Sequence, residues 1–493
     1  MGTLRHPLIL ILISLLKYIT CEYVIGCYYT NWSQHRKEEV KFIPKNIDPK
    51  LCTHAYFAFA NIDTDKWKLM PFEKNDMSDD ANTPSLYDDF KKLKKKNPAL
   101  KTLLSIGGAS AGVEKFRKLC DNDENRKKFI KATIEVLRKY NFDGLDLDWE
   151  FPETNKDKLG FTKLCKDIRL EFQNEAFVSN KPRLLLTAAV AVWRPKVQAG
   201  YEVDKVSQYL DYINLMAYDY HGSWNQRTGH NSPLFARSEQ TGDQQTLNQE
   251  ASINAWIEFG APAEKLVLGL AMYGRTFTLK SKKMNGMNAP ATEAGKAGPY
   301  TQAAGFLSYF EVCKLLKDGW TKEWNEEQKI PFAYKDDQWV GYDDPKSIQI
   351  KCEYVAKRKL AGAMIWSLDL DDFNGNSCSE GKYPLLSSIK KTFDKLTPTT
   401  TRSTTTTKKP SSSATSLIFT NNGFNDKMKD AQAQSLVVNK IKCETCTAEY
   451  IGKTERILHH RVKEHRTGKT SSCFQHMQDN PGHKINYDGV EFV

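Results

Sequence analysis

The chain has 493 residues, of which 40% are hydrophobic and 27% are charged, and this composition excludes a wholly disordered or collagen-like chain. The length suits two to four domains, or one large barrel with appendages. The formal net charge of +11 is spread along the chain, so charge alone does not favour nucleic acid as a partner. The cysteine count is eleven, so the cysteines cannot all pair within one chain.

The first twenty residues predict a secretory signal peptide. Arg5 and His6 precede an apolar run from Leu8 to Leu16. A basic start before a short apolar stretch is typical of a leader, and nine residues are too few to span a bilayer. A buried N-terminal helix is the alternative. We therefore expect a secreted, extracellular protein in which disulfides can form, without a membrane partner.

Eight short apolar runs alternate with helical or loop stretches after the leader. They are residues 23–30, 52–62, 101–108, 143–150, 183–190, 212–220, 265–274 and 362–369. Between the third and fourth runs, residues 125–140 have the apolar spacing of an amphipathic helix. Strands that alternate with helices favour a covered parallel α/β sheet, and eight such units predict a (β/α)8 TIM barrel. A doubly wound open sheet is the alternative.

The interval before the last run is too long for a single helix. Residues 275–346 contain aromatic and glycine-rich segments such as residues 332–334 and 339–342. We expect an inserted small α+β domain there, after the seventh strand. The predicted barrel domain, with this insertion, spans residues 21–393.

Three carboxylates alternate along the fourth predicted strand. Asp146, Asp148 and Glu150 point to one face of it, about 6.6 Å apart, and the residues between them are apolar. In a barrel this row points inward, and Glu150 lies at the C-terminal mouth, where active sites are built. Crowded carboxylates share protons, so at least one pKa should be raised, as a general acid requires. The alternative is a solvated acidic edge strand, which the interleaved apolar residues disfavour.

The motif from Asp143 to Glu150, with acidic residues at 143, 146, 148 and 150, resembles the signature of glycoside hydrolase family 18, the chitinases. The resemblance extends over residues 22–393, and animal chitinases are the most similar. Further matching motifs are residues 27–32, 105–108, 216–224, 273–275 and 364–372. The resemblance implies a secreted endo-chitinase that hydrolyses β-1,4 bonds between N-acetylglucosamine units by a retaining, substrate-assisted mechanism. It implies chitin or chito-oligosaccharides as partners, a monomer, no cofactor, and no nucleic acid.

The resemblance also implies roles for individual residues. Glu150 would be the general acid and base, Asp148 would hold the acetamido group with Asp146 behind it, and Tyr218 would orient the acetamido carbonyl. The implied substrate-binding residues are Tyr28, Trp32, Phe59, Gly107, Gly108, Met216, Asp219, Trp224, Tyr273, Arg275 and Trp366. The implied disulfides are Cys27–Cys52 and Cys313–Cys378, which leave three body cysteines unassigned: Cys120, Cys165 and Cys352.

Two positions depart from the family's pattern. Ala109 follows the glycine pair, where the family commonly has Trp, and Ala303 stands where we expect Glu in the insertion. Both changes weaken the expected binding of long polymers and leave the reacting groups in place. A chitin-binding lectin of the same fold is the alternative function. Such relatives typically lose the acid at the position of Glu150, so its presence favours the enzyme.

One N-glycosylation sequon, Asn31-Trp32-Ser33, lies at the end of the first predicted strand. A glycan there would crowd the expected cleft. We therefore predict that Asn31 carries none.

The composition changes abruptly after the barrel. Residues 394–416 are rich in Ser, Thr and Pro, which is typical of an O-glycosylated linker in a secreted chain. The tail, residues 417–493, carries two Cys-x-x-ligand pairs with the spacing of a zinc site. They are Cys443, Cys446, Cys473 and His476. Scattered surface side chains are the alternative, and no metal is expected in the barrel.

The tail also resembles a degenerate GIY-YIG nuclease module of Penelope-like retroelements. Tyr450 and Arg461 match the catalytic Tyr and Arg of that family, whereas Asn439 replaces the Tyr of its first strand. The helix that usually supplies the metal-binding Glu is missing before Val493. We expect no nuclease activity, and a transposon-derived exon or a gene-model fusion would both account for this segment.

Overall fold

The computed structural model describes residues 22–78, 80 and 82–397, together with the backbone of residues 437–443, 449–454 and 485–492. The chain divides into two compact units, residues 1–400 and 401–493. The predicted signal peptide and most of the predicted linker lie outside the described residues.

Eight parallel strands close into a barrel, which confirms the (β/α)8 prediction and excludes the open sheet. Their order is β1-β15-β8-β7-β6-β5-β4-β2, and β2 pairs again with β1. The strands are β1 (Val24–Thr30), β2 (His54–Asp63), β4 (Lys101–Gly107), β5 (Gly144–Asp148), β6 (Leu185–Val190), β7 (Tyr212–Leu215), β8 (Leu266–Ala271) and β15 (Gly362–Trp366). Each predicted run overlaps one of them. A short antiparallel strand, β3 (Lys68–Pro71), forms a hairpin with β2.

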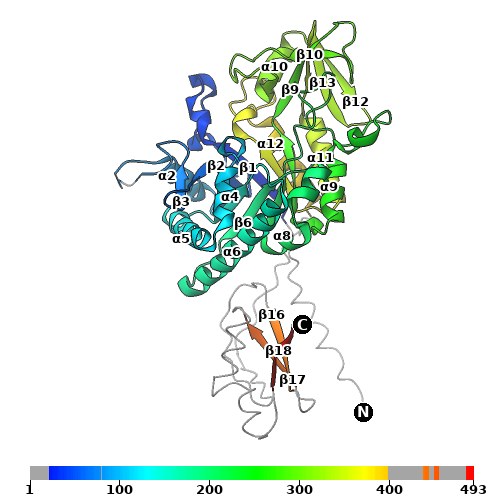
Figure 1. Ribbon diagram of the computed structural model, residues 1–493. Helices are drawn as coiled ribbons and strands as arrows, with labels where there is room; N and C mark the ends of the chain where they lie inside the picture. The colour runs from blue at the N-terminus through cyan, green and yellow to red at the C-terminus, as the bar shows by residue number, and fades with distance from the viewer. Residues whose placement is uncertain are drawn as a thin grey trace, which may run out of the picture. The chain divides into compact units, whose positions relative to one another are not determined.

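Helices surround the barrel strands (Figure 1). They are α2 (Leu86–Lys91), α3 (Leu93–Lys96), α4 (Glu114–Asp121), α5 (Asp123–Lys139), α6 (Asn155–Ser179), α7 (Arg194–Gly200), α8 (Val203–Tyr209), α9 (Gln249–Glu258), α11 (Pro345–Lys357) and α12 (Pro384–Leu396). The helix predicted at residues 125–140 is α5. It begins after Asn122, whose side chain accepts the backbone N–H groups of Glu124 and Asn125. Its buried face includes Phe129 and Leu137.

The outward face of β5 shows how the strands and helices share a core. Leu145, Leu147 and Trp149 are buried, and the Trp149 ring stacks on Phe116 of α4 with centroids 5.2 Å apart. Alternation along the strand therefore sends the apolar residues into the helix layer and the carboxylates into the barrel.

The long interval after β8 forms a separate six-stranded antiparallel sheet with one helix. Its elements are β9 (Tyr273–Leu279), β10 (Ala291–Ala294), β11 (Phe306–Ser308), α10 (Tyr309–Lys317), β12 (Thr321–Asn325), β13 (Ile330–Lys335) and β14 (Gln338–Gly341). The strand order is β10-β9-β14-β13-β12, and β11 pairs with β9. Figure 1 shows this insertion gathered at one end of the barrel. The fold class, including the small α+β insertion, is as the sequence predicts.

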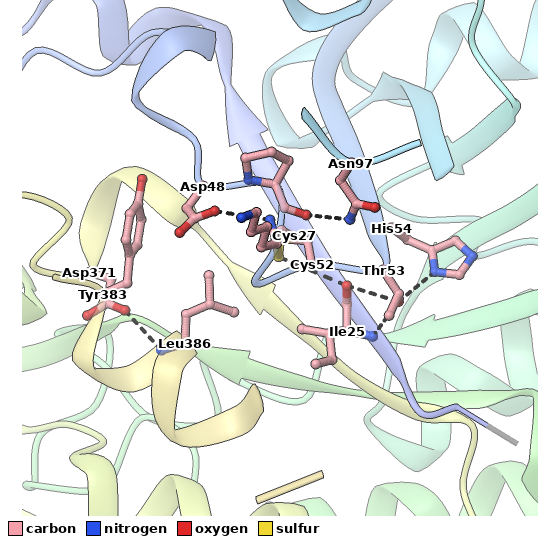
Figure 2. Close-up of a disulfide and its surroundings, with 12 residues drawn as sticks. Ile25, Cys27, Asp48, Cys52, Thr53, His54, Asn97, Asp371, Tyr383 and Leu386 are labelled. Atoms are coloured by element: carbon pink, nitrogen blue, oxygen red, sulfur yellow. Dashed lines mark hydrogen bonds between the residues drawn. A yellow bond between two sulfur atoms is a disulfide. The ribbon is translucent and has the colours of Figure 1, made fainter. Parts of the chain in front are cut away.

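Both disulfides implied by the family resemblance are present. Cys27 on β1 bonds to Cys52, which precedes β2, and Figure 2 shows this bridge beneath the turn that contains Asp48. Cys313 on α10 bonds to Cys378, 65 residues later, and so attaches the insertion's helix to the chain that follows β15. The other cysteines of the described body, Cys120, Cys165 and Cys352, are unpaired, and the last two are buried.

The described part of the tail is a three-stranded antiparallel sheet. Its strands are β16 (Val437–Cys443), β17 (Glu449–Thr454) and β18 (Ile485–Phe492), in the order β17-β16-β18. Within the portion of the chain that the structure describes, every helix is too short or too polar to cross a membrane.

Candidate active site

The innermost carboxylate of the row, Asp146, is fully buried and accepts hydrogen bonds from four barrel strands. The donors are Tyr28 Oη (2.8 Å), Ser105 Oγ (2.7 Å), Thr187 Oγ1 (2.5 Å) and Asn214 Nδ2 (3.2 Å). Burial raises the pKa of Asp146, and these hydrogen bonds oppose that rise. Asp146 is therefore held in one orientation at the centre of the barrel.

Asp148, the middle carboxylate, is buried, but its hydrogen-bonding capacity is not fully used. Its Oδ1 atom has no hydrogen-bond partner among the described residues. Burial, followed by the charges of Glu150 and Asp146, raises the pKa of Asp148 well above its ordinary value. A buried carboxyl oxygen without a partner is costly, and it is suited to accept a donor supplied by a ligand.

Glu150 lies two residues beyond the end of β5 and is partly exposed. Burial, followed by the charge of Asp219, raises its pKa to about 7, although a hydrogen bond from the backbone N–H of Ala109 opposes the shift. A carboxyl group with this pKa can both give and take a proton near neutral pH.

Two glycines at the end of β4 allow the backbone to approach Asp148. Gly107 has φ of 109°, and a Cβ atom on it would lie 2.0 Å from the carbonyl oxygen of Asp148. The N–H of Gly108 donates to that same oxygen at 2.8 Å, and a Cβ atom on Gly108 would lie 2.4 Å from the Phe59 ring. No other residue fits at either position, so the pair aligns the end of β4 with the carboxylate row.

Three aromatic rings gather around Trp366, which lies at the end of β15. The centroid of Trp366 lies 5.5 Å from Tyr28, 5.8 Å from Phe59 and 6.2 Å from Trp32. Met216 packs against the same group. A pocket of about 270 Å³ opens beside them. It is lined by Thr30, Trp32, Arg36, Thr301, Ala303, Phe306, Trp366, Ser367, Asp369 and Leu370.

Asp219, which follows β7, and Tyr273 and Arg275 on β9 form a polar wall beside the row. Tyr273 Oη and Arg275 Nε both donate to Asp219 Oδ1, at 2.8 and 2.7 Å. The Arg275 guanidinium lies 5.2 Å from the ring centroid of Trp224, which is 57% exposed. Tyr218 packs edge-on against Tyr273, with centroids 6.1 Å apart. Burial, followed by the charge of Asp148, raises the pKa of Tyr218, so its hydroxyl stays protonated and able to donate.

The structure therefore brings together the barrel residues that the family resemblance implied. Sequence reasoning missed the groups that hold Asp146. Ser105 stood in a matching motif without a role, and Thr187 and Asn214 were not singled out. The available signal was a polar residue inside an otherwise apolar strand. Thr187 pairs with Asp146 in the barrel register, whereas Asn214 lies two residues beyond Tyr212, the residue that pairs with Thr187.

Asn31, the acceptor residue of the sequon that we predict to carry no glycan, is fully buried. Its Nδ2 atom donates to the carbonyl oxygen of Phe59 (3.2 Å) and to Asp76 Oδ2 (2.7 Å). N-glycosylation would modify this same nitrogen, so the fold leaves no room for a glycan.

The predicted zinc ligands of the tail, and Arg461 of its nuclease-like motif, lie outside the described side chains. Over the described residues of the barrel and insertion, no three His, Cys, Asp or Glu side chains cluster as metal ligands would.

A (β/α)8 barrel with a protonatable glutamate at its mouth and an aromatic cleft is the architecture of a glycoside hydrolase. The model of glycosyl hydrolases family 18 matches residues 24–371, and the chain belongs to this family.

Relatives of this chain include proteins named as chitinases and one named as a pseudo-chitinase. Mouse chitotriosidase-1 is 48% identical over 370 residues, which is 74% of this chain and 77% of that protein. An immunomodulatory active chitinase from Trichuris suis is 39% identical, with a TM-score of 0.72, and the match covers 75% of this chain and 99% of that structure. Human YKL-39, described as a pseudo-chitinase with retained chitooligosaccharide binding, is 42% identical with a TM-score of 0.72, over 76% of this chain and 100% of that structure.

Proposed function

We propose that this protein is a secreted endo-chitinase that cleaves β-1,4 bonds between N-acetylglucosamine units with retention of configuration. The observation that carries the proposal is the pairing of Glu150, whose pKa is about 7, with Asp148, whose buried Oδ1 has no partner among the described residues. The first supplies an acid, and the second supplies an acceptor for a substrate N–H.

In the first step, protonated Glu150 donates its proton to the glycosidic oxygen. The bond from that oxygen to the anomeric carbon breaks, and the leaving sugar carries the proton away. The acetamido carbonyl oxygen of the sugar on the non-reducing side attacks the anomeric carbon and forms an oxazolinium ion. This nucleophile is already attached to the substrate, so little translational entropy is lost in reaching the carbon.

Asp148 and Tyr218 act on the acetamido group during this step. Asp148 accepts its N–H and stabilises the positive charge that develops, while Asp146 shares the Asp148 proton. The Tyr218 hydroxyl donates to the carbonyl oxygen and aims it at the anomeric carbon.

In the second step, Glu150, now a carboxylate, takes a proton from water. The water oxygen attacks the anomeric carbon, the oxazolinium ring opens, and the acetamido group is restored. Glu150 is again protonated. Two displacements at the same carbon give net retention.

Aromatic residues on both sides of the row support cleavage within a chain of sugars. Neutral sugars place their C–H faces on aromatic rings, as Trp366 and Trp32 offer on one side and Trp224 on the other. Ala109 and Ala303 remove a ring and a carboxylate from this cleft. We therefore infer weaker binding of long polymers than a cleft with those groups would give. The two disulfides support secretion into an oxidising, extracellular environment.

A chitin-binding lectin is the second candidate, favoured by the similarity to human YKL-39. The deciding experiment measures release of fluorophore from a fluorogenic chitotrioside by the wild type and by Glu150→Gln, alongside binding to chitin beads. An enzyme turns over the substrate only when Glu150 is present. If the wild type binds chitin but releases no fluorophore, the lectin is the correct function.

A further inference from the structure

Asn231, a fully buried residue between β7 and α9, connects the two sides of the polar wall. Its Oδ1 atom accepts the backbone N–H of Asp219 at 3.0 Å, and its Nδ2 atom donates to the carbonyl oxygen of Tyr273 at 3.1 Å. Its own carbonyl oxygen accepts the N–H of Tyr220 at 3.0 Å. One side chain therefore ties the segment after β7 to the start of β9.

The residues on either side of Asn231 are anchored away from the cleft. His230 Nε2 lies 2.8 Å from the carbonyl oxygen of Tyr342. Ser232 Oγ donates to Asp343 Oδ2 at 2.5 Å, and Lys351 Nζ donates to the Ser232 carbonyl oxygen at 2.6 Å. Asn231 is therefore a rigid support.

Asp219 needs such a support because its backbone is in the left-handed region, with φ of 59°. This conformation is unfavourable for a residue with a side chain unless the surroundings hold it. The hydrogen bond from its N–H to Asn231 does so. In this conformation the Asp219 carboxylate meets both Tyr273 Oη and Arg275 Nε.

We propose that Asn231 is a positioning residue of the active site, which holds Asp219 in the backbone conformation that keeps its carboxylate charge near Glu150. The proposal rests on the proposed function, because it assigns Asn231 an effect on the acid of that reaction. Asn231 touches neither substrate nor reacting atoms and acts only through Asp219.

The consequence is a change in the proton affinity of Glu150. The titratable groups that face Glu150 are Asp148, Asp219, Lys196, Tyr201 and Tyr218. Within this described set, only Asp219 is hydrogen-bonded to Asn231. Without Asn231, Asp219 relaxes away from Glu150, so the pKa of Glu150 falls toward its ordinary value. The alkaline limb of the activity profile then moves to lower pH.

The test compares Asn231→Ala, Asp219→Asn and the double variant by pH profiles of kcat and KM on a fluorogenic chitotrioside. We expect Asn231→Ala to lower kcat by roughly tenfold to a hundredfold, with a smaller change in KM. Its alkaline limb should shift to lower pH in the same direction as that of Asp219→Asn. The double variant should shift no further, because Asn231 acts through Asp219.

The matched control is Thr228→Val. Thr228 is buried three residues away, and its hydroxyl donates to the carbonyl oxygen of Gly286 at 2.8 Å, in the insertion. This variant should lower the melting temperature without moving the pH profile. If Asn231→Ala behaves like Thr228→Val, or if its pH shift adds to that of Asp219→Asn, the proposal is wrong.

Asn231→Ser, which keeps a hydroxyl in the buried site, guards against a variant that does not fold. If neither Asn231 variant folds, Asn231 serves only the stability of the fold, and its positioning role is overturned. The pKa of Glu150 is also read from a carboxyl ¹³C NMR titration, which needs no turnover. A wild type without activity whose Glu150 titration still depends on Asn231 would disprove the proposed function and uphold this inference.

Discussion

Two buried sites in the barrel unit shift the pKa of a carboxyl group in opposite directions from its ordinary value. Asp343 and Lys351 are both fully buried, and Lys351 Nζ lies 2.6 Å from Asp343 Oδ1. Burial acts to raise the pKa of Asp343, but the charge of Lys351, together with His230 and hydrogen bonds from Lys351 and Ser232, outweighs burial and lowers the pKa. In the row of Asp146, Asp148 and Glu150, burial and the charges of the two other carboxylates together raise the pKa of Asp148.

Burial alone therefore does not decide whether a carboxyl group keeps its proton in this protein. The charges and hydrogen-bond donors around the carboxyl group decide. A buried pair of opposite charges joins the segment after β14 to α11, whereas a row of like charges favours retention of a proton. The following experiments test this contrast, from the largest expected effect to the smallest.

Glu150→Gln should reduce kcat by about 10²–10⁴-fold, because the amide can neither give nor take the proton. The variant should fold, since it removes a crowded charge. Hydrolysis of the fluorogenic chitotrioside measures the loss, and circular dichroism measures the fold. The control is Glu171→Gln, an exposed position on α6, which should leave kcat unchanged. Undiminished activity in Glu150→Gln would remove Glu150 from the mechanism.

Lys351→Met should lower the free energy of unfolding by about 3–5 kcal/mol, because it leaves Asp343 buried without its cation. The control is Lys322→Met, which breaks the neighbouring contact from Lys322 Nζ to Asp344 Oδ2 at 2.6 Å. Lys322 is half exposed, and Asp344 keeps the backbone N–H of Ser347 as a donor, so this loss should be smaller than that in Lys351→Met. Urea denaturation measures both. Equal losses in the two variants would show that burial does not distinguish these pairs.

Raising the pH above about 7 should reduce kcat/KM by about tenfold per pH unit, because Glu150 must be protonated to act as the acid. The free energy of unfolding should also decrease as the pH rises. The pKa of Glu150 is raised in the folded state, so its contribution is fully present below its unfolded pKa and is lost as the pH rises through about 7. Activity and melting curves between pH 5 and 9 measure both. Glu150→Gln should remove the part of the pH dependence of the melting temperature that is due to Glu150. Activity that stays constant up to pH 9 would contradict the assignment of Glu150 as the acid.

Ala109→Trp should lower the KM for long chito-oligosaccharides by about two- to tenfold, since an aromatic contact contributes about 0.5–1.5 kcal/mol. The Ala109 side chain is exposed, and its backbone N–H bonds to Glu150. The change should leave kcat for the short chitotrioside within about twofold, because the backbone contact is kept. Measuring both substrates separates the effects. An unchanged KM for the long substrate would show that position 109 contacts no sugar.

Strand alternation made much of the barrel and its carboxylate row predictable. Eight apolar runs separated by helical stretches allow few other architectures, and acidic residues two apart on one strand must share a face. The ends of elements were less predictable. The run at residues 212–220 leaves the strand after Leu215, and Asp219 turns into the left-handed region because Asn231, twelve residues later, holds its N–H.

By itself, the sequence determined that three carboxylates line one face of a barrel strand and that a glutamate stands at its mouth, because side-chain direction follows from local backbone geometry. Only the tertiary structure decided which carboxylate is satisfied and which keeps a proton. Asp146 takes its donors from β1, β4, β6 and β7, while Asp148 is left with an unpartnered oxygen among the described residues. A pKa depends on charges and donors within a few ångströms, and in a barrel these come from strands far apart in the chain.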